Sequence, residues 1–253
     1  MKETEKINIR GLSFDNVTLD EAVARVRTHI KDGTYPLSVF TPNAEIAQMC
    51  IEDERVMRLF SSADMLLPDG AGVLLAAEIL GSPLKGKIAG VDFGEALMAE
   101  GVCCGWRFYF LGGRPGVAME AALKMTERFP GLAVCGFHDG YFEKEGAEND
   151  RVVESIRNAE PHILFVCFGA PAQEMWIAEN KDKIPSLKVC LALGGSLDVY
   201  AGRVKRAPEI FIKLRLEWFY RLLSEPSRIG RMRRIPRYVA GTLRERLHAR
   251  RKK

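Results

Sequence analysis

The segment HILFVCFGAPAQEMW, residues 162–176, decides the fold. Residues 162–168 are almost entirely apolar, which is typical of a strand that is covered on both faces. A glycine and a proline then interrupt the run, and residues 171–183 follow with a helical pattern. A buried strand, a short glycine turn and a helix are together the repeating element of a parallel α/β sheet.

The same alternation runs through most of the chain on either side of this segment. Further short apolar runs predict strands at residues 36–41, 64–67, 107–111, 132–137 and 188–193. Helical patterns lie between them at residues 18–32, 116–129 and 146–159, the first opened by a capping box at Thr18 and Glu21. We therefore predict an α/β fold over residues 1–203, a doubly wound, Rossmann-like, mostly parallel sheet with helices on both faces.

The composition is that of a folded globular protein, but the charge is unevenly distributed. The 253 residues are 47% hydrophobic and 28% charged, with a net charge of +4, which is ordinary. Residues 203–253 hold 17 Lys and Arg against 4 Asp and Glu, a net charge of +13, whereas the rest of the chain carries −9. A basic tail on an acidic body indicates an anionic partner for the tail, such as phosphate, nucleic acid or lipid headgroups.

From residue 209 onward the pattern is helical only. Apolar residues recur at spacings of three and four and then form a looser stripe among basic residues; they are Ile210, Phe211, Leu214, Trp218 and Leu222, followed by Ile229, Met232, Val239, Leu243 and Leu247. We predict a basic amphipathic helical C-terminal appendage over residues 204–253. We also expect a chain that ends after residue 208 to remain folded.

Several classes of protein are disfavoured by simple features of the sequence. The first residues have no apolar signal region, and no run approaches the ~18 apolar residues of a membrane span, so we expect a protein that is neither secreted nor integral to a membrane. The six cysteines are scattered and form no cluster with metal-ligand spacing. We expect reduced thiols, no metal site and no cofactor.

Polar residues and glycines follow nearly every predicted strand. Because ligands bind at the carboxyl ends of parallel strands, these residues predict a binding site along one edge of the sheet. They are Thr41 and Asn43, Asp69 before Gly70, Gly112 and Gly113, Tyr141, Gly169, Gln173 and Glu174, and Gly195 and Asp198. Each alone also fits a helix cap, a turn or a first helical turn, so the prediction depends on their common position.

A set of motifs in a fixed order resembles a known family. The motifs are Thr41-Pro42-Asn43, Pro68-Asp69-Gly70, Gly90-x-Asp92, Leu111-Gly112-Gly113, Gly169-x-Pro171-x-Gln173-Glu174-x-Trp176, Gly194-Gly195-x-x-Asp198, Arg206-Ala207-Pro208 and Glu217-Trp218-x-x-Arg221. From about residue 7 to residue 237 the chain resembles the WecG/TagA/CpsF family of bacterial glycosyltransferases, family 26 in the sequence classification. One departure is Lys87, where the family pattern leads us to expect arginine. Since Lys lacks the bidentate fork, a phosphate contact at Lys87 is left open.

The resemblance implies an inverting, UDP-sugar-dependent hexosyltransferase whose acceptor is a polyprenyl-diphosphate-linked sugar. The best-known members add N-acetylmannosamine, or its uronic acid, to undecaprenyl-diphosphate-N-acetylglucosamine, in teichoic acid linkage units and enterobacterial common antigen. The implied partners are the donor, the acceptor and an anionic membrane surface, without nucleic acid, and a homo-oligomer is left open. The implied location is cytoplasmic and peripheral, on the inner face of the bacterial cell membrane.

The resemblance also suggests roles for individual residues. Inversion requires a carboxylate that removes the acceptor hydroxyl proton, and the aspartate that matches Asp69 in the family is regarded as this base; Thr41 is placed with it. Asp92 and Asp198 are the alternative candidates for the base. Because the sequence has no DxD motif, we expect a metal-independent reaction in which Arg221, Arg228 and Arg231 face the leaving diphosphate. The expected substrate-binding residues are Asn43, Lys87, Asp92, Gly112, Gly113, Tyr141, Gly169, Gln173, Glu174, Gly195, Asp198 and Arg206.

Two other functional classes remain open at this point. The stretch RFYFLGG, residues 107–113, leads into a helix and is followed after the next strand by Asp139, a weak match to a NAD-dependent oxidoreductase whose glycine spacing is imperfect. The stretch RMRRIPR, residues 231–237, would suit a nucleic-acid-binding protein. Neither class explains both the basic tail and the polar edge of the sheet.

Overall fold

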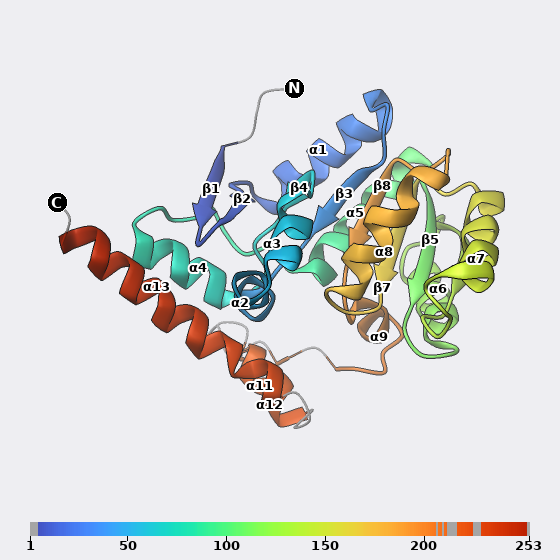
Figure 1. The fold of residues 1–253 in the computed structure, drawn as a ribbon. Helices are drawn as coiled ribbons and strands as arrows, with labels where there is room; N and C mark the ends of the chain where they lie inside the picture. The colour runs from blue at the N-terminus through green and yellow to red at the C-terminus, as the bar shows by residue number, and fades with distance from the viewer. Residues whose placement is uncertain (1–4, 206, 209, 212–216, 225–228, 252–253) are drawn as a thin grey trace. The chain divides into compact units, whose positions relative to one another are not determined.

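The computed structural model describes residues 5–205, 207–208, 210–211, 217–224 and 229–251 (Figure 1). The chain divides into two compact units. The first consists of Met1–Thr18, Thr41–Ala89 and Arg206–Lys253, and the second of Leu19–Phe40 and Gly90–Lys205. Each unit is therefore assembled from segments that are far apart in the sequence.

The second unit is built on a parallel sheet. Its strands are β3 (Leu37–Phe40), β5 (Arg107–Gly112), β6 (Ala133–His138), β7 (Ile163–Cys167) and β8 (Val189–Ala192). They pair in the order β3-β8-β7-β5-β6, and each of these pairs is parallel. Every residue of the central strand β7 is buried, which explains why its sequence is an unbroken apolar run.

Helices connect and flank these strands (Figure 1). They are α1 (Leu19–Asp32), α5 (Gly90–Cys104), α6 (Val117–Arg128), α7 (Gly146–Ala159), α8 (Ala172–Asn180), the 3-10 turn η1 (Lys181–Lys183) and α9 (Ser196–Tyr200). Helix α6 packs against β5, β6 and α9, while α8 packs against β3, β7 and β8. The α/β, Rossmann-like prediction and the four predicted helices are confirmed.

Aromatic side chains fill the centre of this unit. The ring of Phe165 on β7 stacks on Phe110 with centroids 5.3 Å apart, and it meets the edge of Phe108 at 5.6 Å. All three rings are fully buried. Such pairs add about 0.5–1.5 kcal/mol beyond the area they bury, so the ends of these strands are held on a rigid core.

The first unit begins with a hairpin that the sequence analysis did not predict. Strands β1 (Lys6–Ile9) and β2 (Leu12–Asp15) pair antiparallel, with Ile9 opposite Leu12. The two turn residues, Arg10 and Gly11, have φ values of 53° and 93°. Both must be left-handed in this type of turn, for which Asn-Gly is the usual signal. An arginine in the first position hid the turn from the sequence pattern.

The rest of the first unit is mainly helical. Its elements are α2 (Ala44–Glu52), α3 (Glu54–Ser61), β4 (Met65–Leu66), α4 (Ala71–Leu80), α11 (Glu217–Ser224), α12 (Ile229–Met232) and α13 (Arg234–Arg251). The strand β4 confirms the sixth predicted strand, and the C-terminal helices confirm the predicted helical tail. Helix α13 packs lengthwise against α2 and α4 (Figure 1).

The packed face of the tail differs from the apolar stripe seen in the sequence. Tyr238 and Thr242 of α13 are fully buried, whereas Leu243 and Leu247 are about half exposed. The stripe through Leu243 and Leu247 is therefore not the face that packs on the protein. Helix α13 therefore has one face packed in the first unit and another face in solvent.

Candidate active site

The loop that carries Asp69 is fixed at both ends within the first unit. Asp69 follows the buried strand β4, and its backbone N–H donates to the carbonyl of Pro42 at 3.2 Å. The carbonyl of Pro68 accepts from the N–H of Ile88 at 2.8 Å. Gly70 has φ 84° and forms the N-cap of α4. The half-buried Asp69 side chain is therefore carried by a rigid loop next to the N-terminus of α4.

A second helix begins against this loop. Asn43 is the N-cap of α2, and its Oδ1 accepts from the N–H of Ile46 at 3.0 Å. A Cβ placed on Gly70 would lie 3.7 Å from Cβ of Asn43, and one on Gly72 would lie 2.6 Å from Cβ of Ala44. The N-terminal turns of α2 and α4 therefore touch, and their partial positive charges suit an anion.

The structure brings α13 to the same place. The Cβ position of Gly72, in the first turn of α4, lies 3.9 Å from Cγ2 of Ile235 in the first turn of α13. Helix α12 packs against α13 and carries Arg231, which is exposed. Among the tail arginines predicted to be catalytic, Arg231 thus lies four residues before Ile235, whose side chain lies against α4, the helix that follows Asp69.

Lys87 has a partner that sequence reasoning missed. Its Nζ donates to Oε1 of Glu217, the first residue of α11, at 2.5 Å. Both side chains are about three-quarters buried, with 23% and 25% exposed. The pair joins α11 to the segment that Ile88 ties to the Asp69 loop. No spacing in the sequence relates residues 130 positions apart, and a role for Lys87 in substrate binding stays a prediction.

In the second unit the predicted glycines shape the carboxyl ends of the strands. Gly112 has φ 134°, and a Cβ there would lie 2.3 Å from the carbonyl oxygen of Cys167, so only glycine fits. The carbonyl of Gly113 accepts from the N–H of Gly140 at 2.8 Å. The loops after β5, β6 and β7 are thereby drawn together.

Gln173 ties two further loops to each other. Its Oε1 accepts from the N–H of Gly169 at 3.2 Å and from the N–H of Gly194 at 3.0 Å, and its Nε2 donates to Glu174 at 2.8 Å. Gln173 is only 3% exposed. The side chain therefore holds the loops after β7 and β8, and its polar groups are directed to the protein in this structure.

Glu174 is a buried acid in the first turn of α8. It is 1% exposed, and its Oε2 has no hydrogen-bond partner among the described residues. Burial raises the pKa of Glu174 to about 7, partly offset by the hydrogen bond from Gln173. Glu174 therefore keeps its proton at mildly acidic pH, where an exposed glutamate is ionised, a property that the sequence did not reveal.

A lysine at this edge also escaped the sequence analysis. Nζ of Lys144 donates to the carbonyls of Gly140 at 2.8 Å and Phe142 at 2.6 Å. It lies 3.6 Å from the ring centroid of Phe142 and 4.6 Å from that of Phe168. Burial lowers the pKa of Lys144. The only sequence signal was a lysine close to several aromatic residues, which is too common to select it.

The other predicted residues take varied positions. Asp92 lies in the first turn of α5, Gly195 is the N-cap of α9, and Asp198 follows in that short helix. Tyr141 is 68% exposed, and its N–H donates to Oδ1 of Asp139 at 2.8 Å. Thr41 is half-buried two residues before the N-cap of α2. Arg206, Arg228 and the side chain of Arg221 lie outside the described residues.

Three further features bear on the chemistry. In the part of the chain that the structure describes, no group of three or more His, Cys, Asp or Glu is placed to hold a metal ion. Among the same residues no helix has the length and apolar character that crossing a bilayer requires. The six cysteines, all within the described residues, form no disulfide, and burial raises the pKa of the Cys167 thiol to about 12, so this thiol stays protonated.

Comparison with known proteins identifies the family. The family model described as "Glycosyl transferase WecG/TagA/CpsF family" matches residues 7–252. A protein of Bacillus spizizenii named N-acetylglucosaminyldiphosphoundecaprenol N-acetyl-beta-D-mannosaminyltransferase is 36% identical over 241 residues, which cover 95% of this chain and 91% of that protein. Proteins of the same name from Bacillus subtilis and Staphylococcus aureus are each 33% identical over 237 residues, covering 94% and 93% of this chain and 91% of theirs.

These matches favour the glycosyltransferase interpretation over an oxidoreductase or a nucleic-acid-binding protein. They extend over nearly the whole chain and include both compact units. The α/β fold, the fixed Asp69 loop and the glycine-rich strand ends are all present in the matched range. The chain belongs to the WecG/TagA/CpsF family of glycosyltransferases.

Proposed function

We propose that this protein transfers N-acetylmannosamine from a UDP-sugar to polyprenyl-diphosphate-linked N-acetylglucosamine, with inversion at the anomeric carbon. The relatives that match nearly end to end are named as transferases of this kind. The reaction belongs to surface-polymer synthesis of the teichoic acid linkage type. The observation that carries the proposal is the Asp69 loop, which holds a carboxylate beside two touching helix N-termini.

Asp69 serves as the general base in this proposal. The acceptor hydroxyl loses its proton to the carboxylate while its oxygen forms a bond to the anomeric carbon and UDP departs from the opposite side. A base must keep its position through this displacement, and the hydrogen bonds to Pro42 and from Ile88 supply that rigidity. Thr41 directly precedes Pro42, whose carbonyl accepts the hydrogen bond from Asp69.

The leaving diphosphate is stabilised by positive charge from the first unit. The N-termini of α2 and α4 lie beside the Asp69 loop, and their partial positive charges suit the diphosphate. Arg231 on α12 is exposed, and we assign it to contact the leaving diphosphate. We assign this role to Arg221 and Arg228 as well. A guanidinium group binds two diphosphate oxygens at once, and these hydrogen bonds strengthen as negative charge develops on the leaving group. The reaction is expected to be independent of metal ions.

Donor binding is assigned to the strand ends of the second unit. Gly169 and Gly195, where an added Cβ would meet no described atom within 4 Å, allow a nucleotide to approach closely, whereas Gly112 and Gly113 shape the loop after β5. The exposed ring of Tyr141 offers a surface for stacking. Asp92 and Asp198 accept hydrogen bonds from sugar hydroxyls, whereas Gln173 acts from within by holding the loops after β7 and β8, and Glu174 accepts a hydrogen bond from Gln173.

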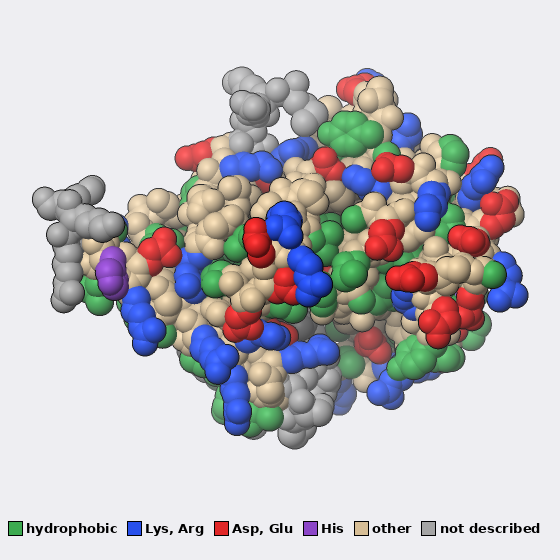
Figure 2. Space-filling view, viewed as in Figure 1, with side chains coloured by type: hydrophobic (Ala, Val, Ile, Leu, Met, Phe, Trp, Pro, Cys, Tyr) green, Lys and Arg blue, Asp and Glu red, His purple; other side chains and the backbone are tan. Residues whose placement is uncertain are grey.

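The tail brings the enzyme to a membrane surface that holds the acceptor, on the cytoplasmic face. Figure 2 shows Lys and Arg side chains gathered along the C-terminal helices. Leu243 and Leu247, four residues apart, are exposed on α13, and Trp218 and Phe219 are exposed on α11. Apolar side chains among cations suit the interface of an anionic bilayer. Each Lys or Arg near such a surface adds about 1 kcal/mol.

A donor panel tests this function. Purified protein is mixed with a short-chain polyprenyl-diphosphate-N-acetylglucosamine and one UDP-sugar at a time, and the product linkage is determined by NMR. We expect transfer from UDP-N-acetylmannosamine with a β linkage. Transfer from none of the donors, or a product with retained configuration, would refute the proposal.

A further inference from the structure

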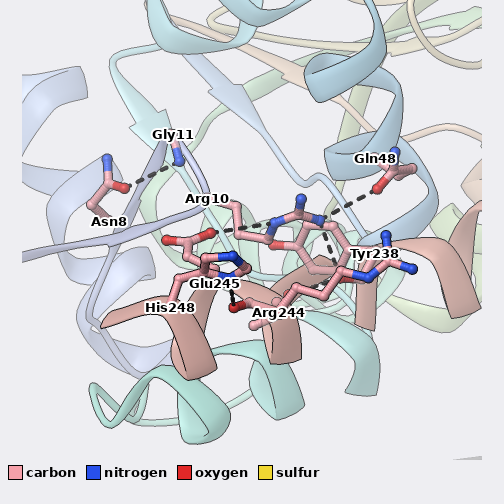
Figure 3. Close-up of polar contacts among 9 residues, drawn as sticks. Asn8, Arg10, Gly11, Gln48, Tyr238, Arg244, Glu245 and His248 are labelled. Carbon is pink, nitrogen blue, oxygen red and sulfur yellow. Dashed lines mark hydrogen bonds and ion pairs between the residues drawn. The ribbon is translucent and has the colours of Figure 1, made fainter. Parts of the chain in front are cut away.

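The tip of the N-terminal hairpin contacts the C-terminal helix α13 (Figure 3). Nη1 of Arg10 donates to the backbone carbonyl of Tyr238 at 3.1 Å and to Oε1 of Gln48 on α2 at 3.4 Å. Nε of Arg10 lies 3.6 Å from Oε2 of Glu245. One guanidinium therefore joins three elements: the hairpin, α2 and α13.

The contact is made where α13 is most deeply buried. Tyr238 is fully buried, and the guanidinium carbon of Arg10 lies 5.3 Å from its ring centroid. The carbonyl of Tyr238 also accepts from Oγ1 of Thr242 at 2.8 Å. Charge-assisted hydrogen bonds and cation–π contacts gain strength as water is excluded. The buried contact with Arg10 therefore helps to fix the position of α13.

Helix α13 has a glycine at the point where the guanidinium approaches. A Cβ on Gly241 would lie 2.6 Å from both Nη atoms of Arg10 and 2.7 Å from the carbon between them. Glycine inside a helix is less favourable than alanine. Its presence here is explained by the space that Arg10 occupies.

Three other arginines hold α13, of which Arg237 lies 3.8 Å from Glu52 and is 71% exposed. Arg234 pairs with Glu52 at 2.8 Å, and both side chains are about one-third exposed. Arg246 donates to the carbonyl of Leu80 at 3.1 Å, at the far end of α4. The side chain of Arg10 is only 15% exposed, so its interactions are less weakened by water and salt than those of Arg234.

The fixed part of α13 is the part nearest the catalytic loop. Tyr238 follows Ile235 by one helical turn, and Ile235 lies against Gly72 in the first turn of α4. Helix α12, with Arg231, packs against α13 just before this point. A shift of this turn would move Arg231 relative to the loop of Asp69.

We infer that Arg10 is a positioning residue for sugar transfer: it docks the first half of α13 and so sets the place of Arg231 beside the Asp69 loop. The inference rests on the proposed function, in which Arg231 faces the leaving diphosphate. Arg10 itself touches no reacting atom. Its loss therefore lowers turnover and leaves donor binding unchanged.

A double-mutant cycle between Arg10 and Gly241 tests the inference in the full-length enzyme. We expect Arg10→Ala to lower kcat at least tenfold, to keep KM for the UDP-sugar within twofold, and to speed hydrogen exchange of residues 234–242. Gly241→Ala should do the same, because it displaces the guanidinium. In the Arg10→Ala background the second change should cost nothing further, since the collision is gone. Arg10→Lys, which retains one cation, should recover part of kcat.

Asn8→Ala is the matched control, because it removes the bond from Gly11 N–H to Asn8 Oδ1 in the same turn without touching α13. It should leave kcat near that of the wild type. Additive effects of the Arg10 and Gly241 changes, or unaltered exchange in α13 of Arg10→Ala, would overturn the inference. An Arg231→Ala enzyme with wild-type turnover would instead refute the role of Arg231 in the proposed function, and the exchange data would still decide whether Arg10 docks α13.

Discussion

Replacing the buried acid Glu174 by glutamine should stabilise the protein at neutral and alkaline pH but not at acid pH. Burial raises the pKa of Glu174 from 4.5 to about 7. Between these two values the folded protein keeps a proton that the unfolded chain has lost, so stability falls as pH rises. At 1.36 kcal/mol per unit, the wild type loses about 3 kcal/mol by the time pH exceeds 7. Glutamine does not titrate and avoids this loss, although its amide adds an unpaired donor that offsets part of the gain.

The assay is reversible urea unfolding of wild type and Glu174→Gln from pH 4.5 to 8.5. The difference in unfolding free energy between the two proteins should grow by about 2–3 kcal/mol across this range. Glu179→Gln, on the exposed side of the same helix, should show little change. A difference between Glu174→Gln and the wild type that is constant with pH would refute the assignment of Glu174 as a neutral buried acid.

Three further perturbations follow from the structure. The Lys87–Glu217 pair should show a coupling energy on the order of 1 kcal/mol in unfolding experiments, so that the double reversal Lys87→Glu with Glu217→Lys is more stable than either single change; equal and additive losses would contradict the pair. Truncation after residue 208 should lower the melting temperature by on the order of 10 °C, because it removes Tyr238 and its neighbours from the surfaces of α2 and α4. An unchanged melting temperature would instead show that residues 1–208 are stable without the tail. Saturating chelator should leave the transfer rate unchanged, and loss of activity that Mg²⁺ or Mn²⁺ reverses would contradict a metal-independent reaction.

The sequence predicted the α/β fold well because strand burial and helix periodicity are local properties. The apolar run of residues 162–168 and the helical pattern after it appear in the structure as β7 and α8. The hairpin at Arg10 was missed because its turn uses an uncommon residue in a left-handed conformation. The sequence predicted a folded body after truncation at residue 208 that loses membrane binding and transfer, but a helical pattern does not reveal that α13 packs against α2 and α4.

The candidate site was predictable only in part. Asp69 and Asn43 each follow a predicted strand, so they were expected to lie together at the carboxyl ends of these strands. In the structure their two loops are in contact. Whether a polar side chain faces a ligand or the protein interior is a tertiary property. Gln173 and Glu174 lie inward for this reason. Pairs such as Lys87 with Glu217 depend on how distant segments fold together, and no local spacing encodes them.

The turnover of Asp69→Asn tests the central claim most directly. Asparagine keeps the shape of the side chain but does not accept the acceptor proton, so kcat should fall by roughly 10²–10⁴-fold. UDP affinity, measured by calorimetry, should stay within about twofold, since Asp69 is assigned no part in donor binding. Asp53→Asn, which alters an exposed helix cap in the same unit, should leave kcat essentially unchanged. Wild-type turnover of Asp69→Asn, with UDP binding intact, would contradict the assignment of Asp69 as the base.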